Sequence, residues 1–196
     1  DKPVLGYNLG NMGMLYQNKG NTEKALNYHM RSLEIFEELG DKNAQGISHN
    51  NIGNVYYREG DYNKTLDCYT RSLTIRQELG NKHGIGGSYN NIGLVYLETL
   101  ENDKAFSILQ KAINIQEEID AIELESIIFL SLVKKRLGKK YNKDKILNLI
   151  NKSKHIEDYV NFYLYQLTEK TSYLKNAYNQ IIKKADNLES VVKEKF

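Results

Sequence analysis

The feature that most constrains this chain is one phrase that returns at a constant interval. It reads NNIGNVYY at residues 50–57 and NNIGLVY at 90–96, and a looser copy, NMGMLY, stands at 11–16. The recurring glycine and tyrosine positions are 40 residues apart; they are Gly13, Gly53 and Gly93, and Tyr16, Tyr56 and Tyr96. Self-similarity at a period of about 20–50 residues is typical of stacked repeats, in which each unit contacts only its neighbours.

Each repeat is expected to be a pair of helices. Apolar residues at helical spacing predict first helices at 4–18, 44–58 and 84–98, and second helices at 22–39, 62–79 and 102–119. Gly20-Asn21 and Gly60-Asp61 combine a glycine that ends one helix with a residue that caps the next. A mid-helix glycine costs about 1 kcal/mol relative to alanine. Its recurrence at one helical position therefore predicts a close helix crossing.

The pattern weakens after residue 120. We expect three repeats at 1–40, 41–80 and 81–120, and a degenerate fourth repeat at 121–154 with helices at 122–137 and 143–153. A capping pair should follow at 155–196, with helices at 156–168 and 171–195. Atypical terminal repeats are usual where a solenoid must cover its apolar end. The prediction is one continuous all-α solenoid. Because Asp1-Lys2 aligns with the repeat junction at Asp41-Lys42, we also expect a piece of a longer protein.

Composition argues against several functional classes. The chain is 40% hydrophobic and 27% charged, as globular proteins are, and its net charge of +2 is too small to indicate nucleic acid by itself. No run of about 18 apolar residues predicts a membrane span. Cys68, the single cysteine, stands at a helix-core position. It is predicted to be a small buried hydrophobe, and the lack of a disulfide partner favours a reducing, cytoplasmic location.

The sequence shows no pattern for catalysis, a metal or a cofactor. The histidines occupy unrelated repeat positions, and neither a His-Glu-x-x-His motif nor a cysteine pair accompanies them; they are His29, His49, His83 and His155. His29 and His49 align with Tyr69 and Tyr89, which predicts packed side chains rather than ligands. The glycines at 84–87 follow no strand, so they do not form a phosphate loop. We predict no enzymatic activity within this chain and no cofactor.

The repeated residues resemble a known family. The order Gly13, Tyr16, Ala25, with a small residue at Ser32, is similar to the tetratricopeptide repeat in its longer form of about 40 residues, as in kinesin light chain. Residues 78–93, ELGNKHGIGGSYNNIG, look most like bacterial arrays attached to sensor kinases, nucleotide cyclases or transcription regulators.

The resemblance covers about residues 5–119, and it implies a right-handed superhelix of antiparallel helix pairs. The chain departs from the family pattern where Leu100 replaces the turn glycine, where Thr65 replaces a small alanine, and where His49 or Tyr89 stands in place of a tryptophan.

The resemblance also implies a concave groove that binds a protein or an extended peptide. Groove positions carried over around the mid-helix glycines are Asn11, Met14, Asn50, Asn51, Asn54, Tyr57, Arg58, Asn90, Asn91, Leu94, Leu97 and Glu98. Because each amide offers two donors and an acceptor, Asn11, Asn51 and Asn91 are candidates for a ladder along a peptide backbone. The alternative is that these amides satisfy neighbouring helices. Gly10 stands where a clamp for a C-terminal carboxylate needs lysine, so no such clamp is expected.

Two functional hypotheses follow. The first is a binding scaffold that serves as the sensing or assembly region of a larger bacterial signalling protein, of nucleotide cyclase or kinase type. The second is a nucleic-acid-associated regulatory module that uses the basic segment 134–154, since this segment could contact an anionic partner or be a solvated cap. Its cations are Lys134, Lys135, Arg136, Lys139, Lys140, Lys143, Lys145, Lys152 and Lys154.

Aromatic residues in the C-terminal region cover more than one helix face, which makes self-association through these helices possible. They are Tyr159, Phe162, Tyr163 and Tyr165.

Overall fold

The computed structural model describes residues 1–152 and 156–193, with side chains described for 1–151 and 156–183. The chain divides into two compact units, unit 1 at residues 1–121 and unit 2 at 122–196. The regular structure of the described residues consists of ten α-helices. The predicted all-α repeat superhelix is confirmed.

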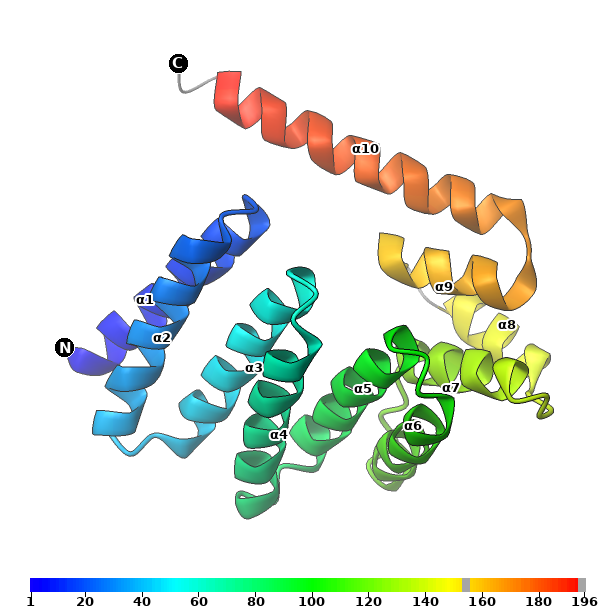
Figure 1. Ribbon diagram of the computed structural model, residues 1–196, viewed down its shortest axis with the longest axis horizontal. Helices are drawn as coiled ribbons and strands as arrows, with labels where there is room; N and C mark the ends of the chain where they lie inside the picture. Colours follow the sequence, from blue (N-terminus) through cyan, green and yellow to red (C-terminus); the bar gives the residue numbers. More distant parts are fainter. Residues whose placement is uncertain (153–155, 194–196) are drawn as a thin grey trace. The chain divides into compact units, whose positions relative to one another are not determined.

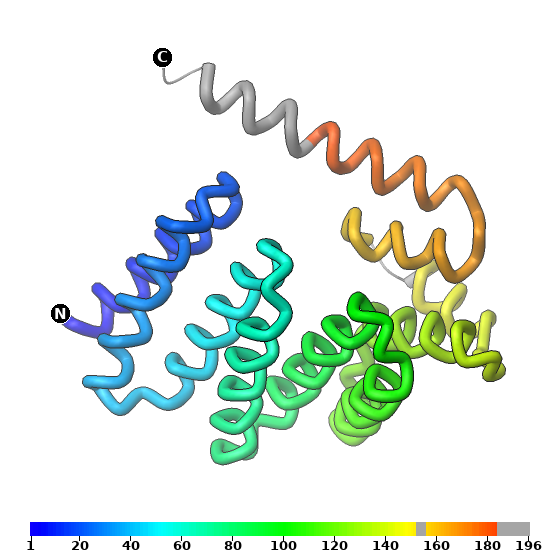
Figure 2. Tube along the Cα trace, in the orientation of Figure 1, coloured from blue at the N-terminus to red at the C-terminus, as the bar shows by residue number. Residues whose placement is uncertain are grey.

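Unit 1 consists of three antiparallel helix pairs in succession (Figures 1 and 2). The first helices are α1 (Lys2–Asn18), α3 (Lys42–Arg58) and α5 (Lys82–Glu98), and the second helices are α2 (Thr22–Glu38), α4 (Tyr62–Glu78) and α6 (Asn102–Glu118). Successive pairs join through the second helix of one and the first helix of the next, because α2 packs on α3 and α4 packs on α5.

The first helices begin two residues before their predicted starts, and the second helices end one residue early. Asp41 accepts a hydrogen bond from the Ala44 backbone nitrogen at 2.9 Å, so α3 begins at Lys42. Asn81 caps α5 in the same way. These caps precede the first apolar position of each helix, which is why the apolar pattern places the start too late. The predicted caps Asn21 and Asp61 are confirmed.

The repeated mid-helix glycines mark the closest helix crossings, as predicted. A Cβ atom at Gly53 would lie 2.6 Å from the Tyr69 ring, closer than real Cβ contacts occur. At Gly13 the corresponding neighbour is His29 at 2.6 Å, and at Gly93 it is Leu109 at 2.5 Å.

Small residues on the second helices form hydrogen bonds to the first helices about two turns before these crossings. The Ser32 hydroxyl donates to the carbonyl of Gly6 at 2.8 Å, and Ser72 donates to the carbonyl of Gly46 at 2.8 Å. Both serines are buried. This recurring bond pairs the second helix with the first inside each of these two repeats.

A lysine lies over each repeated tyrosine. The Nζ atoms of Lys24, Lys64 and Lys104 lie 5.1, 5.2 and 5.3 Å from the ring centroids of Tyr16, Tyr56 and Tyr96. Such cation–π contacts are worth about 0.5–1 kcal/mol at exposed sites. The lysines recur at the same period as the tyrosines, a signal that the sequence carries but that our predictions did not include.

The two junctions between repeats differ in chemistry. At the first, Gln45 Nε2 donates to the Phe36 carbonyl at 2.9 Å. At the second, Arg76 Nη1 donates to the Gly84 carbonyl at 3.0 Å and to Ser88 Oγ at 2.8 Å. A Cβ at residue 84 would lie 2.7 Å from the Arg76 side chain, so glycine there provides the space for arginine.

Unit 2 contains α7 (Leu124–Arg136), α8 (Lys143–Lys152), α9 (Asp158–Thr168) and α10 (Thr171–Lys193). Helix α7 packs on α8 and α9, and α9 packs on α10. Helices α7 and α9 begin two residues later than predicted because Glu123 and Glu157 have extended backbone. The ring of Phe129 on α7 meets that of Tyr163 on α9 edge-on at 5.0 Å.

Two predicted helix ends, Ser153 and Lys195, lie outside the described residues. The assignment of unit 2 to a degenerate repeat and a capping pair stays a prediction.

Candidate functional site

The first helices of unit 1 bring three predicted groove residues around one small cavity. Asn11 and Met14 of α1 and Asn51 of α3 line a space of about 100 Å³. The other lining residues were not predicted; they are Tyr7, Gly10, Ser32, Phe36, Ala44, Ile47 and Ser48. Tyr7, Met14 and Ile47 are exposed, so the cavity opens to solvent beside apolar side chains. We use the name first-helix groove for the surface of α1, α3 and α5 that is predicted to carry Asn11, Met14, Asn51, Asn91 and Leu94; the cavity includes the first three of these residues.

The asparagines of adjacent repeats are joined directly. Asn91 Nδ2 on α5 donates to Asn50 Oδ1 on α3 at 2.9 Å. An amide has two N–H donors and a carbonyl acceptor, so this bond uses one of the two N–H donors of Asn91. Asn54 is also engaged, because its Oδ1 accepts from the Tyr69 hydroxyl at 2.7 Å. The alternative that we considered for the ladder asparagines was bonding to neighbouring helices, and the contact of Asn91 with Asn50 matches it.

Two of the predicted groove residues are buried. Leu97 is fully buried and Asn90 is 7% exposed. Asn90 stands three residues before Gly93 and Leu97 four residues after it. Both residues therefore share with Gly93 the face of α5 that packs against α6. The expectation that they line an open groove therefore needs correction, since burial leaves them little surface for a ligand. Within the described residues, Asn90 Oδ1 has no hydrogen-bond partner.

The remaining predicted residues lie toward the C-terminal ends of the first helices. Arg58 donates to the Gln17 carbonyl at 3.0 Å and so links the ends of α3 and α1. Tyr57 is half-buried, and its ring lies 5.9 Å from that of Tyr62. Leu94 is half-buried and Glu98 is exposed.

The cysteine and two of the histidines, which are the side chains most often reactive in proteins, are buried or half-buried here. Cys68 is buried, and burial raises the pKa of its thiol to about 11, which confirms the prediction of a buried small side chain. His29 is buried against Gly13, and burial lowers its pKa, so its predicted packing role is confirmed. His49 is half-buried, and burial likewise lowers its pKa. The described residues contain no group of three His, Cys, Asp or Glu side chains suited to a metal ion.

In unit 2, part of the basic segment is used within the protein. Lys135 Nζ donates to the carbonyls of Gln166 and Leu167 at 3.0 and 3.2 Å and pairs with Glu169 at 2.8 Å, so it caps the C-terminal end of α9. Arg136 donates to the Gln166 side chain at 3.1 Å. Lys154 lies outside the described residues. Tyr159 and Phe162 are exposed whereas Tyr163 is buried. The possibility of self-association stays a prediction.

Considered over its described part, the chain has no helix with the length and apolar character that crossing a bilayer requires. A search of curated proteins found no match to the sequence.

Solved structures share the fold over most of this chain. The apo form of RapI matches 93% of the chain with a TM-score of 0.76 at 23% identity, and the chain covers 54% of RapI. A Rap protein complexed with competence and sporulation factor matches 99% of the chain (TM-score 0.73, 15% identity, 58% of that protein covered). A STAND signal-transduction ATPase with a tetratricopeptide repeat sensor, from Pyrococcus horikoshii, also matches 99% (TM-score 0.65, 19% identity, 32% covered). The chain therefore spans less than two thirds of each of these proteins.

The family itself is shown by the sequence. The model of the tetratricopeptide repeat matches residues 6–78 and 44–118, which together make up more than half of the chain. These matches span the three helix pairs whose crossings and caps are described above. The chain belongs to the tetratricopeptide repeat family.

Proposed function

We propose that this chain is a non-catalytic scaffold that binds a protein or an extended peptide in the first-helix groove. One observation carries the proposal: Asn11, Met14 and Asn51 surround a single cavity between successive first helices. Asn91 continues the same amide position on α5, where it is linked to Asn50. An extended peptide alternates side chains with polar backbone groups. The apolar recess suits one of its side chains, and the amides on either side suit its backbone.

The apolar and the amide side chains of the groove would bind different parts of a peptide. Tyr7, Met14 and Ile47 offer exposed apolar surface for a side-chain anchor. The amides of Asn11, Asn51 and Asn91 offer donors and acceptors to the peptide backbone, each bond contributing about 0.5–1.5 kcal/mol net. Modest affinity is therefore expected, with the anchor supplying selectivity.

The same fold in other proteins supports a role in signalling. A Rap protein of this fold has been solved in complex with competence and sporulation factor, and the STAND protein uses a tetratricopeptide repeat sensor. We infer that this chain is the sensing or assembly region of a larger signalling protein. The nucleotide cyclase and kinase contexts implied by the bacterial resemblance are the first to test.

The test selects peptides from a random display library on the wild-type chain and measures their dissociation constants by fluorescence anisotropy. Asn51→Ala combined with Asn91→Ala should weaken binding about tenfold or more, because two backbone bonds are lost. Asn27→Ala, on the exposed surface of α2, is the matched control and should leave affinity unchanged. Selected peptides that bind the double variant as tightly as wild type would refute the groove assignment.

The alternative, a nucleic-acid-associated module that uses residues 134–154, has less support. Lys135 and Arg136 bond to the C-terminal part of α9, which commits two cations of the segment to structure. Retention on DNA that falls steeply with salt and is abolished by Lys139→Glu with Lys140→Glu would restore it.

A further inference from the structure

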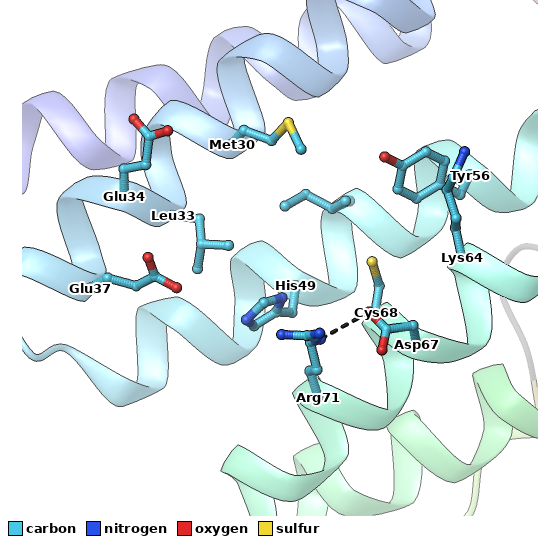
Figure 3. Close-up of a pocket in the computed structure, with 11 residues that line it drawn as sticks. Met30, Leu33, Glu34, Glu37, His49, Tyr56, Lys64, Asp67, Cys68 and Arg71 are labelled. Carbon is cyan, nitrogen blue, oxygen red and sulfur yellow. Dashed lines mark hydrogen bonds and ion pairs between the residues drawn. The ribbon is translucent and has the colours of Figure 1, made fainter.

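Unit 1 carries a second and larger cavity on a different face of α3. It encloses about 360 Å³ between α2, α3 and α4 (Figure 3). It is lined by Met30, Leu33, Glu34, Glu37, His49, Ile52, Tyr56, Lys64, Asp67, Cys68 and Arg71. His49 here and Asn51 in the first-helix groove are two residues apart on α3, about 200° around the helix axis. The two sites can therefore be occupied independently.

The cavity has an apolar floor. Ile52 and Cys68 are buried, and Leu33 is half-buried beside them. Met30 is exposed and adds a flexible apolar edge on the α2 side. Such a floor suits the aliphatic part of a ligand, and the volume is near the lower end of the roughly 300–1,000 Å³ usual for small-ligand sites.

The charges on the two walls are not balanced. On α4, Arg71 Nε pairs with Asp67 at 2.9 Å and Lys64 pairs with Asp61 at 2.8 Å, so both cations are compensated. On α2, Glu34 and Glu37 stand about one helical turn apart. Among the residues that the structure describes, neither of these two carboxylates forms an ion pair. The cavity therefore has an excess of negative charge on its α2 wall.

The next repeat has larger side chains at two positions that line this cavity. Forty residues later, Tyr89 replaces His49 and Ile108 replaces Cys68. Both larger side chains pack against the hydrophobic cluster of Tyr69, Leu73, Ile92 and Val95.

The carboxylates are lost at the same place. Thr74 and Gln77 replace Glu34 and Glu37, and the Gln77 amide donates to the Tyr89 hydroxyl at 3.2 Å. The first junction thus combines smaller side chains at positions 49 and 68 with two carboxylates on α2 that the second junction lacks on α4, a combination that the repeat pattern does not require.

We propose that this cavity binds an arginine side chain of a partner protein. The guanidinium group would pair with Glu34 and Glu37, because its planar fork of donors matches carboxylates. Its aliphatic stem would lie on Met30 and Leu33, as long basic side chains do on apolar surface. This site is additional to the first-helix groove and does not depend on it.

The three methionines of the chain make the test specific to the site. The full chain, labelled with ¹³C at its methionine methyl groups, is titrated with acetyl-leucyl-arginine amide. Met30 reports on this cavity and Met14 on the first-helix groove. The Met30 signal should shift while the Met14 signal stays in place. The citrulline peptide, in which a neutral urea replaces the guanidinium, should bind about tenfold more weakly, since charge-assisted bonds are lost.

Three variants complete the experiment. Glu34→Gln with Glu37→Gln should weaken binding of the arginine peptide about tenfold or more. Glu78→Gln, which removes an exposed carboxylate of α4 outside the cavity, should not. His49→Tyr with Cys68→Ile installs the side chains of the next repeat and should abolish the Met30 shift; if it fails to fold, the glutamine variant decides.

Equal shifts from the arginine and citrulline peptides, unchanged affinity in the glutamine variant, or a silent Met30 at millimolar peptide would overturn the proposal. A shift of Met14 alone would also overturn it, while leaving the first-helix groove proposal in place.

Discussion

Leu100 has a backbone conformation that suits glycine better than leucine. It has φ +62° at the end of α5, where the equivalent turns use Gly20 and Gly60 at +72° and +75°. A side chain in this left-handed region costs about 1–2 kcal/mol. Leu100 is 66% exposed, so burial of its side chain offsets little of this conformational strain.

Leu100→Gly should therefore raise the free energy of unfolding by about 0.5–1 kcal/mol. The gain is smaller than the strain because glycine also increases the freedom of the unfolded chain. Urea denaturation followed by circular dichroism measures the change, with Gly60→Leu as the opposite substitution, expected to destabilise. A loss of stability in Leu100→Gly would mean that the leucine side chain has contacts that outweigh its strain.

His29 should make stability depend on pH. Burial lowers its pKa below the ordinary 6.5, so in mild acid the unfolded chain binds a proton that the folded chain does not. Stability is therefore fully present above pH 6.5 and falls as the pH drops below it, by at most about 1.4 kcal/mol per pH unit for one histidine.

His29→Leu, which copies Leu109 of the third repeat, should reduce this loss. His49 retains a contribution of the same sign, because burial lowers its pKa as well. Urea midpoints at pH 7.5 and 5.5 compare the two chains. An equal loss in both would exclude His29 as a source.

Single residues differed in how far the sequence could predict them. The packing of His29 and Cys68 followed from alignment with apolar or aromatic residues one period away, because equivalent positions share a helix face. The bond from Asn91 to Asn50 could not be predicted. This bond depends on how the side chains are oriented across a repeat junction. Asparagines that bind a peptide backbone and asparagines that bond to each other give the same sequence pattern.

At the scale of helices, the crossing at Gly53 and the open position at Gly87 form a matched pair of tests. Gly53→Ala places a Cβ 2.6 Å from Tyr69 and should cost about 1–3 kcal/mol. Gly87 lies within α5 with nothing within 4 Å of its added Cβ. Gly87→Ala should therefore stabilise the chain by about 0.5–1 kcal/mol through helix propensity. Thermal melts of both variants suffice, and stabilisation by Gly53→Ala would contradict the close crossing.

Helix ends show what periodicity can and cannot locate. The turns after α1 and α3 could be placed because Gly20 and Gly60 punctuate the sequence at a fixed interval. The starts of α3 and α5 were placed two residues late, because Asp41 and Asn81 act before the apolar face begins. Leu97 was predicted to line the groove from its spacing to Gly93 alone. That spacing gives the helix face of Leu97 but not whether the face is buried, and the structure buries it.

At the scale of unit 1, the helix pairs should differ in stability. Val4 and Leu5 on α1 are 52% and 51% exposed, whereas Ala44 and Gln45, at the same register on α3, are 2% and 8% exposed. The difference arises because α2 covers this face of α3. In a repeat array, stability is approximately a sum of terms within units and between neighbours.

Amide hydrogen exchange should therefore be faster in α1 than in α3, because α3 opens only when contacts on two sides are lost. Exchange followed residue by residue by NMR in the native state measures both helices in one sample. Equal protection of α1 and α3 would show that unit 1 opens as a single cooperative block.

The unlike junctions also limit how the gene can change by recombination. Looping out codons 42–81 would remove one 40-residue period and leave the reading frame and the Asp41 cap intact. The shortened product would set Phe36 where Arg76 now serves Gly84 and the buried Ser88, leaving both without their donor. The second and third repeats are therefore not interchangeable, and a chain that lost residues 42–81 would need a new donor for Gly84 and Ser88 at the new junction.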